Sequence, residues 1–186
     1  MSRMAPVIDR YAAGGPLLVY ATSGLAPEHE TTRVGPGTWS IAELVAHLLD
    51  SDLVHGDRMK RVIAEDEPVL QAFDENRWID RLDSRAMPVE EAVNLFHAHR
   101  RWMTRILRDR PDADFTRVGL HTESGRKALA DLVATAVGHV DHHLRFLFAK
   151  RAALGVALIP HYSDDVPIER REPERHPRTD RDQERP

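Results

Sequence analysis

The sequence predicts an all-α fold, a bundle of four main helices. Apolar residues recur at intervals of three and four through four long segments, which is the spacing of one buried helix face. Stretches rich in proline, glycine and polar residues separate these segments, and such stretches end helices. No two runs of alternating β-branched residues are long enough to pair as strands. A chain of 186 residues is expected to form one domain with its own core.

The first helix is expected over residues 4–23, interrupted or kinked at Gly14-Gly15-Pro16, because proline removes a backbone donor and clashes with the preceding turn. Residues 24–37 are polar, hold two prolines and three glycines, and are expected to form a loop. The second helix begins after Ser40 and continues to about residue 65. Ser40 and Glu43 have the spacing of a capping box, in which each side chain bonds the other residue's backbone N–H.

A looser segment follows Pro68. The third helix opens with Pro88 as its first residue, where proline costs least, and ends before Pro111. Residues 112–125 are expected to be a connector, and the fourth helix covers about residues 127–151. Residues 1–160 are therefore assigned to the bundle. Residues 161–186 are mostly proline, arginine and acidic residues, a composition typical of a disordered tail.

The chain contains no cysteine. Disulfides, thiolate catalysis and iron–sulfur clusters are therefore excluded, and a metal site must be built from histidine, carboxylates and water. The net charge is −4 with acidic and basic residues intermixed, so no nucleic-acid partner is expected. Charged residues, glycine and proline interrupt the N-terminal segment, which fits neither a signal peptide nor a membrane span. A cytoplasmic protein without a membrane partner is the expectation.

Three histidines fall within residues 138–143. His139 and His143 are four residues apart, so on a helix both rings project from one face and can offer two nitrogens to one metal ion. With eleven histidines in the chain, random placement gives roughly 0.6 such pairs, and the alternative is two half-buried histidines on a helix flank. Their position beside Leu132 and Ala136 favours a metal, because buried neutral imidazoles need partners. His142 points elsewhere and is interpreted as a surface or supporting residue.

Four segments in order resemble the DinB/YfiT-like superfamily over roughly residues 5–155. Residues 38–50 resemble its Trp-Ser-x-x-Glu-x-x-x-His-Leu pattern, and residues 138–143 resemble its late His-x-x-x-His helix. Residues 121–125 are similar to its His-then-Gly stretch, and residues 73–78 to its acidic-plus-Trp segment. The resemblance implies an up-down four-helix bundle, often a homodimer, with a metal in a cleft at one end. It places the metal ligands at His47, His139 and His143.

Three histidines leave a coordination position open for water or substrate, as in catalytic sites. One divalent ion is expected, with zinc preferred for three neutral imidazoles and nickel, iron or manganese as alternatives. The first hypothesis is a metal-dependent hydrolase that acts on a small molecule through a bound water. The resemblance also implies a thiol-dependent S-transferase of the bacillithiol or mycothiol type. A third hypothesis is a non-catalytic metal- or ligand-binding stress protein.

Candidate residues around the ligands have structural alternatives. Asp50, three residues after His47, is a candidate orienting carboxylate or a solvated side chain, and Glu43 is better explained as the capping partner. Glu123 is a candidate acid or base on the loop before the last helix, or a solvent-facing residue. His99 and Arg100 interrupt the apolar stripe of the third helix and are candidate substrate-binding residues. The alternative for Arg100 is a side chain that reaches out beside the bundle.

Overall fold

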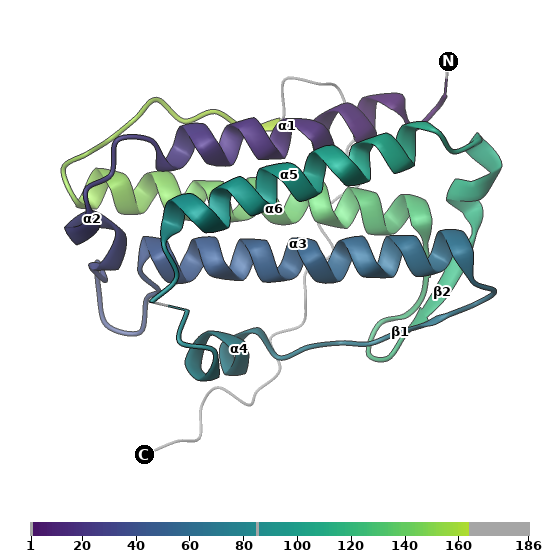
Figure 1. Cartoon of the computed structure of the whole chain (residues 1–186), viewed down its shortest axis with the longest axis horizontal. Coiled ribbons are helices and arrows are strands. Elements are labelled where there is room, and N and C mark those ends of the chain that lie inside the picture. Colours follow the sequence, from purple (N-terminus) through teal and green to yellow (C-terminus); the bar gives the residue numbers. More distant parts are fainter. Residues whose placement is uncertain (1, 85, 164–186) are drawn as a thin grey trace.

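The computed structural model describes residues 2–84 and 86–163. Within these ranges, four long helices form a bundle (Figure 1): α1 (Ala5–Thr22), α3 (Ile41–Ala64), α5 (Val89–Arg108) and α6 (Leu129–Ala153). The predicted all-α four-helix bundle is confirmed, and each long helix lies within a few residues of its expected range.

The helices are not packed in chain order. α1 and α3 each pack against both α5 and α6, so α1 lies diagonally opposite α3, and α5 opposite α6. In Figure 1, α1 and α6 start at the end of the bundle that carries the strands, whereas α3 and α5 finish there. Two helices thus run each way, in the chain order up (α1), down (α3), down (α5), up (α6). Because the consecutive helices α3 and α5 are parallel, residues 65–88 must cross back along the bundle.

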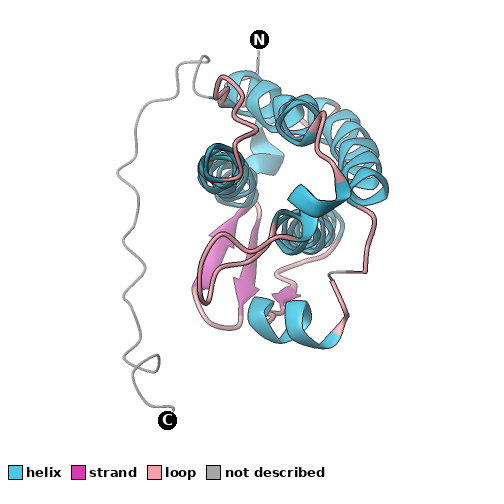
Figure 2. Ribbon diagram, turned by 90° about the vertical axis from the view of Figure 1, so that its left-hand side faces the viewer, coloured by secondary structure: helices cyan, strands magenta, loops and turns pink. Residues whose placement is uncertain are grey.

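Several short elements occupy segments that the sequence indicated as loops or connectors. Strand β1 is parallel to β2, and β2 is antiparallel to β3 with Leu120 opposite Arg126. Strands this short show no alternation that a sequence pattern could reveal. Figure 2 shows the sheet at one side of the helices, with α4 nearby. The elements are α2 (Pro27–Thr31), β1 (Val69–Leu70), α4 (Glu75–Arg81), the 3₁₀ helix η1 (Asp112–Thr116), β2 (Val118–His121) and β3 (Gly125–Ala128).

Helix α1 is continuous through Pro16, so the predicted break at Gly14-Gly15-Pro16 is wrong. The two glycines serve packing. A Cβ on Gly14 would lie 2.6 Å from Arg100 Nη1, and one on Gly15 would lie 2.5 Å from His97 Nδ1. Both neighbours belong to α5, so the glycines let α1 and α5 approach closely. The packing of α1 on α5 and α6 keeps the helix intact although proline removes one hydrogen bond.

The predicted capping box at the start of α3 is present. Glu43 N donates to Ser40 Oγ at 3.2 Å, and Ser40 N donates to Glu43 Oε2 at 2.7 Å. Arg33 adds a hydrogen bond from Nε to Glu43 Oε2 at 2.9 Å and a second from Nη2 to Oε1. Glu43 is therefore used in fixing the start of the helix. Pro88 is the N-cap of α5, and Val89 is its first residue, one position later than predicted.

A polar layer divides the apolar core into two clusters, each with side chains from all four long helices. One cluster lies toward the start of α3 and includes Leu18, Leu48, Phe96 and Leu144; the other lies toward the sheet and includes Ile8, Met59, Met103 and Val133. Between them along the chain lie Gly14 on α1, Asp52 on α3, Arg100 on α5 and His139 on α6. The chemistry-bearing side chains of the bundle are concentrated in this layer and next to it.

The chain after α6 packs back onto the bundle. Ser163 is buried; its N–H donates to Asp141 Oδ1 at 2.9 Å and its hydroxyl donates to Oδ2. Arg10 donates from Nε to Ser163 Oγ and from Nη2 to Asp141 Oδ2, both at 3.0 Å. The predicted tail, residues 161–186, thus begins in a packed segment, and its part from residue 164 onward lies outside the described residues. The boundary at residue 160 stays a prediction.

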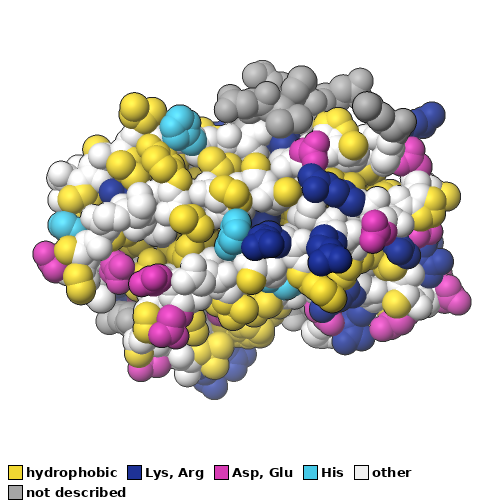
Figure 3. Space-filling view, turned by 45° about the horizontal axis from the view of Figure 1, so that its top comes forward, with side chains coloured by type: hydrophobic (Ala, Val, Ile, Leu, Met, Phe, Trp, Pro, Cys, Tyr) yellow, Lys and Arg dark blue, Asp and Glu magenta, His cyan; other side chains and the backbone are white. Residues whose placement is uncertain are grey.

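None of the described helices has the combination of length and apolar character that crossing a membrane requires. On the face shown in Figure 3, acidic and basic side chains lie among one another and among apolar ones.

Candidate metal centre

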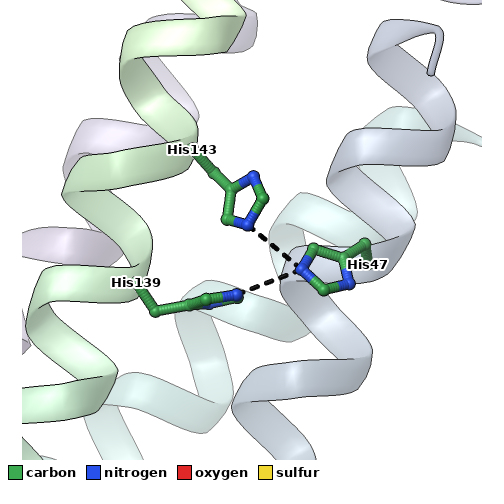
Figure 4. Close-up of side chains that lie close together, drawn as sticks. All are labelled: His47, His139 and His143. Carbon is green, nitrogen blue, oxygen red and sulfur yellow. Dashed lines mark hydrogen bonds between the residues drawn. The ribbon is translucent and has the colours of Figure 1, made fainter. Parts of the chain in front are cut away.

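Three histidine rings from two helices converge on one point (Figure 4). His47 Nε2 lies 3.0 Å from His139 Nε2 and 3.1 Å from His143 Nε2. In the part of the chain that the structure describes, these three residues form the one group of three or more candidate ligand atoms lying within 4.8 Å of one another. The structure therefore brings together the three residues predicted as metal ligands from the family resemblance.

The helix geometry explains the convergence. His139 and His143 are one turn apart on α6, so their rings project from one face of the helix and meet edge to face, with centroids 4.5 Å apart. His47 projects from the inner face of α3, where it is 2% exposed, and α3 packs directly against α6. The Trp39 ring, just before the start of α3, lies 4.9 Å from the His47 ring and covers it. Two packed helices thus hold all three rings.

The surroundings keep the three imidazoles neutral. Burial lowers the pKa of His47 to about 4. Burial, together with the neighbouring His47 and His142, lowers the pKa of His143 to about 3. Burial and then the nearby His143, His55, His47 and Arg100 hold the pKa of His139 far below its usual range. A neutral imidazole has a lone pair on one ring nitrogen, which is the form that binds metals.

The donor set fits a divalent cation. Tetrahedral zinc binds histidine nitrogen at about 2.0–2.1 Å, which places two ligand nitrogens about 3.3 Å apart, close to the 3.0 and 3.1 Å that separate the nitrogens here. Each of the three imidazoles presents its Nε2 to the others, and in a neutral ring this nitrogen is either a donor or an acceptor. The three rings therefore cannot all be satisfied by hydrogen bonds with one another. One cation would bind all three lone pairs at once.

One residue near the site was missed by sequence reasoning. Glu75 Oε2 lies 3.9 Å from His47 Nε2, and its side chain is 53% exposed. It belongs to α4, which packs against α3. The acidic-plus-Trp segment was noticed in the sequence through its resemblance, but nothing in it indicated which carboxylate approaches the histidines.

The predicted carboxylates Asp50 and Glu123 are not in the convergent group. Asp50 is half-buried on α3, and burial raises its pKa. Glu123 lies in the exposed turn between β2 and β3, where its N–H donates to His121 Nδ1 at 3.2 Å. Their catalytic roles stay predictions. His142 is exposed and is not part of the convergent group.

Arg100 and His99, the predicted substrate-binding residues, belong to a separate buried network. Arg100 is 1% exposed. It donates to Asp52 Oδ1 at 2.8 Å, to the Tyr11 carbonyl at 3.0 Å and to the Ala136 carbonyl at 2.9 Å. His99 Nδ1 lies 2.7 Å from Asp52 Oδ2. Arg100 thus ties four helices together instead of reaching out beside the bundle, and these contacts give no support to a substrate-binding role.

The chain belongs to the DinB superfamily, whose sequence model matches residues 14–147. It is 32% identical to a "Putative metal-dependent hydrolase" of Geobacillus thermodenitrificans, over 73% of this chain and 76% of the relative. A relative of the same description from Oceanobacillus iheyensis is 32% identical over 69% of this chain and 74% of its own. The fold resembles that of YfiT from Bacillus subtilis, described as a probable metal-dependent hydrolase with an unusual four-helix bundle topology. The TM-score is 0.77 at 22% identity, over 83% of this chain and 90% of YfiT.

Proposed function

We propose that this protein is a metal-dependent hydrolase with one divalent ion, preferably zinc, held by His47, His139 and His143. The observation that carries the proposal is the convergence of three Nε2 atoms from α3 and α6. Its support is strengthened by the relatives described as metal-dependent hydrolases. A small molecule is the proposed substrate.

A divalent ion held by three imidazoles leaves a coordination position open and lowers the pKa of a water there to about 7. The chain's own residues prepare this position. The three rings are held by two packed helices, so little reorganisation is needed to bind the ion. Burial keeps the rings unprotonated at neutral pH, so protons do not compete for their lone pairs.

The expected homodimer and cytoplasmic location stay predictions, as does the thiol-transferase alternative, whose thiol would occupy the same open position. The functional test therefore includes both reactions. Full-length protein freed of metal and reloaded with zinc is assayed against p-nitrophenyl esters, and against an electrophile together with bacillithiol, mycothiol or glutathione.

The zinc-loaded protein is expected to hydrolyse at least one ester without added thiol. His139→Ala should lose this activity, whereas His142→Ala, which removes an exposed ring from the same helix, should keep it. Retained hydrolysis in His139→Ala would contradict the proposal, and turnover only with a thiol would replace the hydrolase by the transferase.

A further inference from the structure

Glu75 brings a negative charge to an otherwise neutral site. Its Oε2 lies 3.9 Å from His47 Nε2, the ring nitrogen that faces the convergence point. The Asp74 side chain accepts a hydrogen bond from Arg77 N at 3.0 Å and caps the start of α4. The first turn of α4, which carries Glu75, is thereby fixed beside α3. Glu75 thus projects from the first turn of a capped helix that packs against α3.

The position of Glu75 differs from that of a fourth ligand. A tetrahedral ligand would lie about 3.3 Å from each of the other three donor atoms. Glu75 approaches His47 but is not in the group whose ligand atoms all lie within 4.8 Å of one another. A carboxylate oxygen 3.9 Å from one of the three converging nitrogens is within reach of a group bound at the open position.

We propose that Glu75 is the general base of the site, an inference that rests on the proposed function. Its Oε2 accepts a hydrogen bond from the water at the open position and then takes that proton. The electron pair of the broken O–H bond stays on the water oxygen, which forms a bond to the electrophilic carbon of the substrate. Oε2 returns the proton to the leaving group as its bond to that carbon breaks, so one water is consumed and the protein is regenerated.

This placement makes the open position selective. Water donates a hydrogen bond to the carboxylate, whereas a small anion has no proton to donate and is repelled by its charge. Two like charges about 4 Å apart repel by about 1 kcal/mol even in water and by more near a protein surface. Glu75 should therefore weaken the binding of anions at the open position while leaving the three histidines free to hold the metal.

The test uses the full chain loaded with Co²⁺, whose visible absorption reports its ligands, and azide as the anionic probe. Wild type, Glu75→Gln and Asp80→Asn are compared by equilibrium dialysis with Co²⁺ and by azide titration. Asp80→Asn is the matched control, because it removes the same charge from the same helix. Asp80 lies five residues after Glu75, so its side chain projects about 140° away from that of Glu75 around the helix axis.

Glu75→Gln is expected to bind one Co²⁺ with less than a 100-fold loss of affinity, and to bind azide about ten-fold more tightly than wild type. Asp80→Asn should match wild type in both. Equal azide affinity in all three proteins would overturn the proposed role of Glu75 and leave the metal site itself unaffected. Loss of stoichiometric Co²⁺ binding in Glu75→Gln would show that Glu75 is a metal ligand, and would also overturn its role as the general base. Failure of wild type to bind Co²⁺ would overturn the metal site itself, and the inference with it.

Discussion

Two groups of buried polar side chains lie next to each other in the bundle, and they differ in what satisfies them. In the network of Asp52, His99 and Arg100, a carboxylate, a ring and a guanidinium are joined to each other and to backbone carbonyls. In the histidine group, three nitrogens of the same kind face each other. Charges are paired within the first group, whereas the second consists of neutral rings whose Nε2 atoms meet one another. Burial alone therefore does not distinguish a structural cluster from a binding site. The two differ in whether the converging polar atoms already have the partners that buried groups need.

Removal of the charge partner in the first group should give the largest effect. Asp52→Ala leaves the Arg100 guanidinium buried without its carboxylate, so we expect a loss of about 3–5 kcal/mol in the free energy of unfolding, measured by urea denaturation. Asp9→Ala is the control, since Asp9 pairs with Arg108 at 2.7 Å but both side chains are more than half exposed; its cost should stay below about 1 kcal/mol. Equal losses in the two variants would show that the buried network stabilises the fold no more than the exposed ion pair does.

The histidine group should respond to metal instead. Zinc at 1,000 times its dissociation constant should raise the free energy of unfolding of wild type by about 4 kcal/mol. In His47→Ala this increase should vanish at the same zinc concentration, while far-UV circular dichroism of the metal-free variant still shows helix. A metal-dependent increase that survives in His47→Ala would remove this residue from the site.

Two helical glycines lie beside the two groups, Gly14 against Arg100 and Gly138 next to His139 in the chain. Gly14 lies against Arg100, where a Cβ would be 2.6 Å from Nη1, whereas a Cβ on Gly138 would meet no atom within 4 Å. Gly14→Ala must displace an arginine fixed by three acceptors and should cost about 1–3 kcal/mol. Gly138→Ala, next to the proposed ligand His139, should stabilise the protein by up to about 1 kcal/mol. Thermal unfolding of both variants measures the difference, and an unchanged midpoint for Gly14→Ala would contradict the tight contact.

The smallest expected effect is a loss of stability at low pH. Burial tends to raise the pKa of Asp52, but Arg100 and His99 outweigh it and hold that pKa below its usual range. A carboxyl whose folded pKa is depressed contributes stability that is present above its unfolded pKa, about 3.9, and is lost as pH falls through the folded value. Wild type should therefore lose more stability than Asp52→Asn between pH 4 and 3, as measured by urea denaturation. Equal losses would contradict the depressed pKa.

The two groups also differ in how far the sequence could predict them. His47, His139 and His143 were predicted as ligands because the segments around them resemble two signatures of the DinB/YfiT-like superfamily, and each signature lies within one helix. Arg100 was interpreted as a substrate-binding or outward-reaching residue, because its partner Asp52 lies on another helix 48 positions earlier. A charged residue in an apolar stripe does not reveal which residue pairs with it.

The same limit applies to backbone. Gly14-Gly15-Pro16 was interpreted as a break because its partners His97 and Arg100 on α5 are distant in sequence. Glu75 was missed because its location depends on the path of residues 65–88 across the bundle. Helix existence follows from local periodicity and capping, whereas contacts between elements depend on an arrangement that no local pattern encodes.

The order of the helices has a consequence for how the chain folds. Three pairs of long helices are consecutive in the chain, and of these α3 and α5 pack together. Helix α1 packs on α5 and α6 instead of α3, and α6 packs on α1 and α3 instead of α5. Each apolar cluster needs side chains from all four, so no helical hairpin can collapse into a stable core ahead of the rest. Many native contacts between the long helices therefore join segments that are distant in sequence. We therefore expect slower refolding than in a bundle of the same length whose neighbouring helices pair directly.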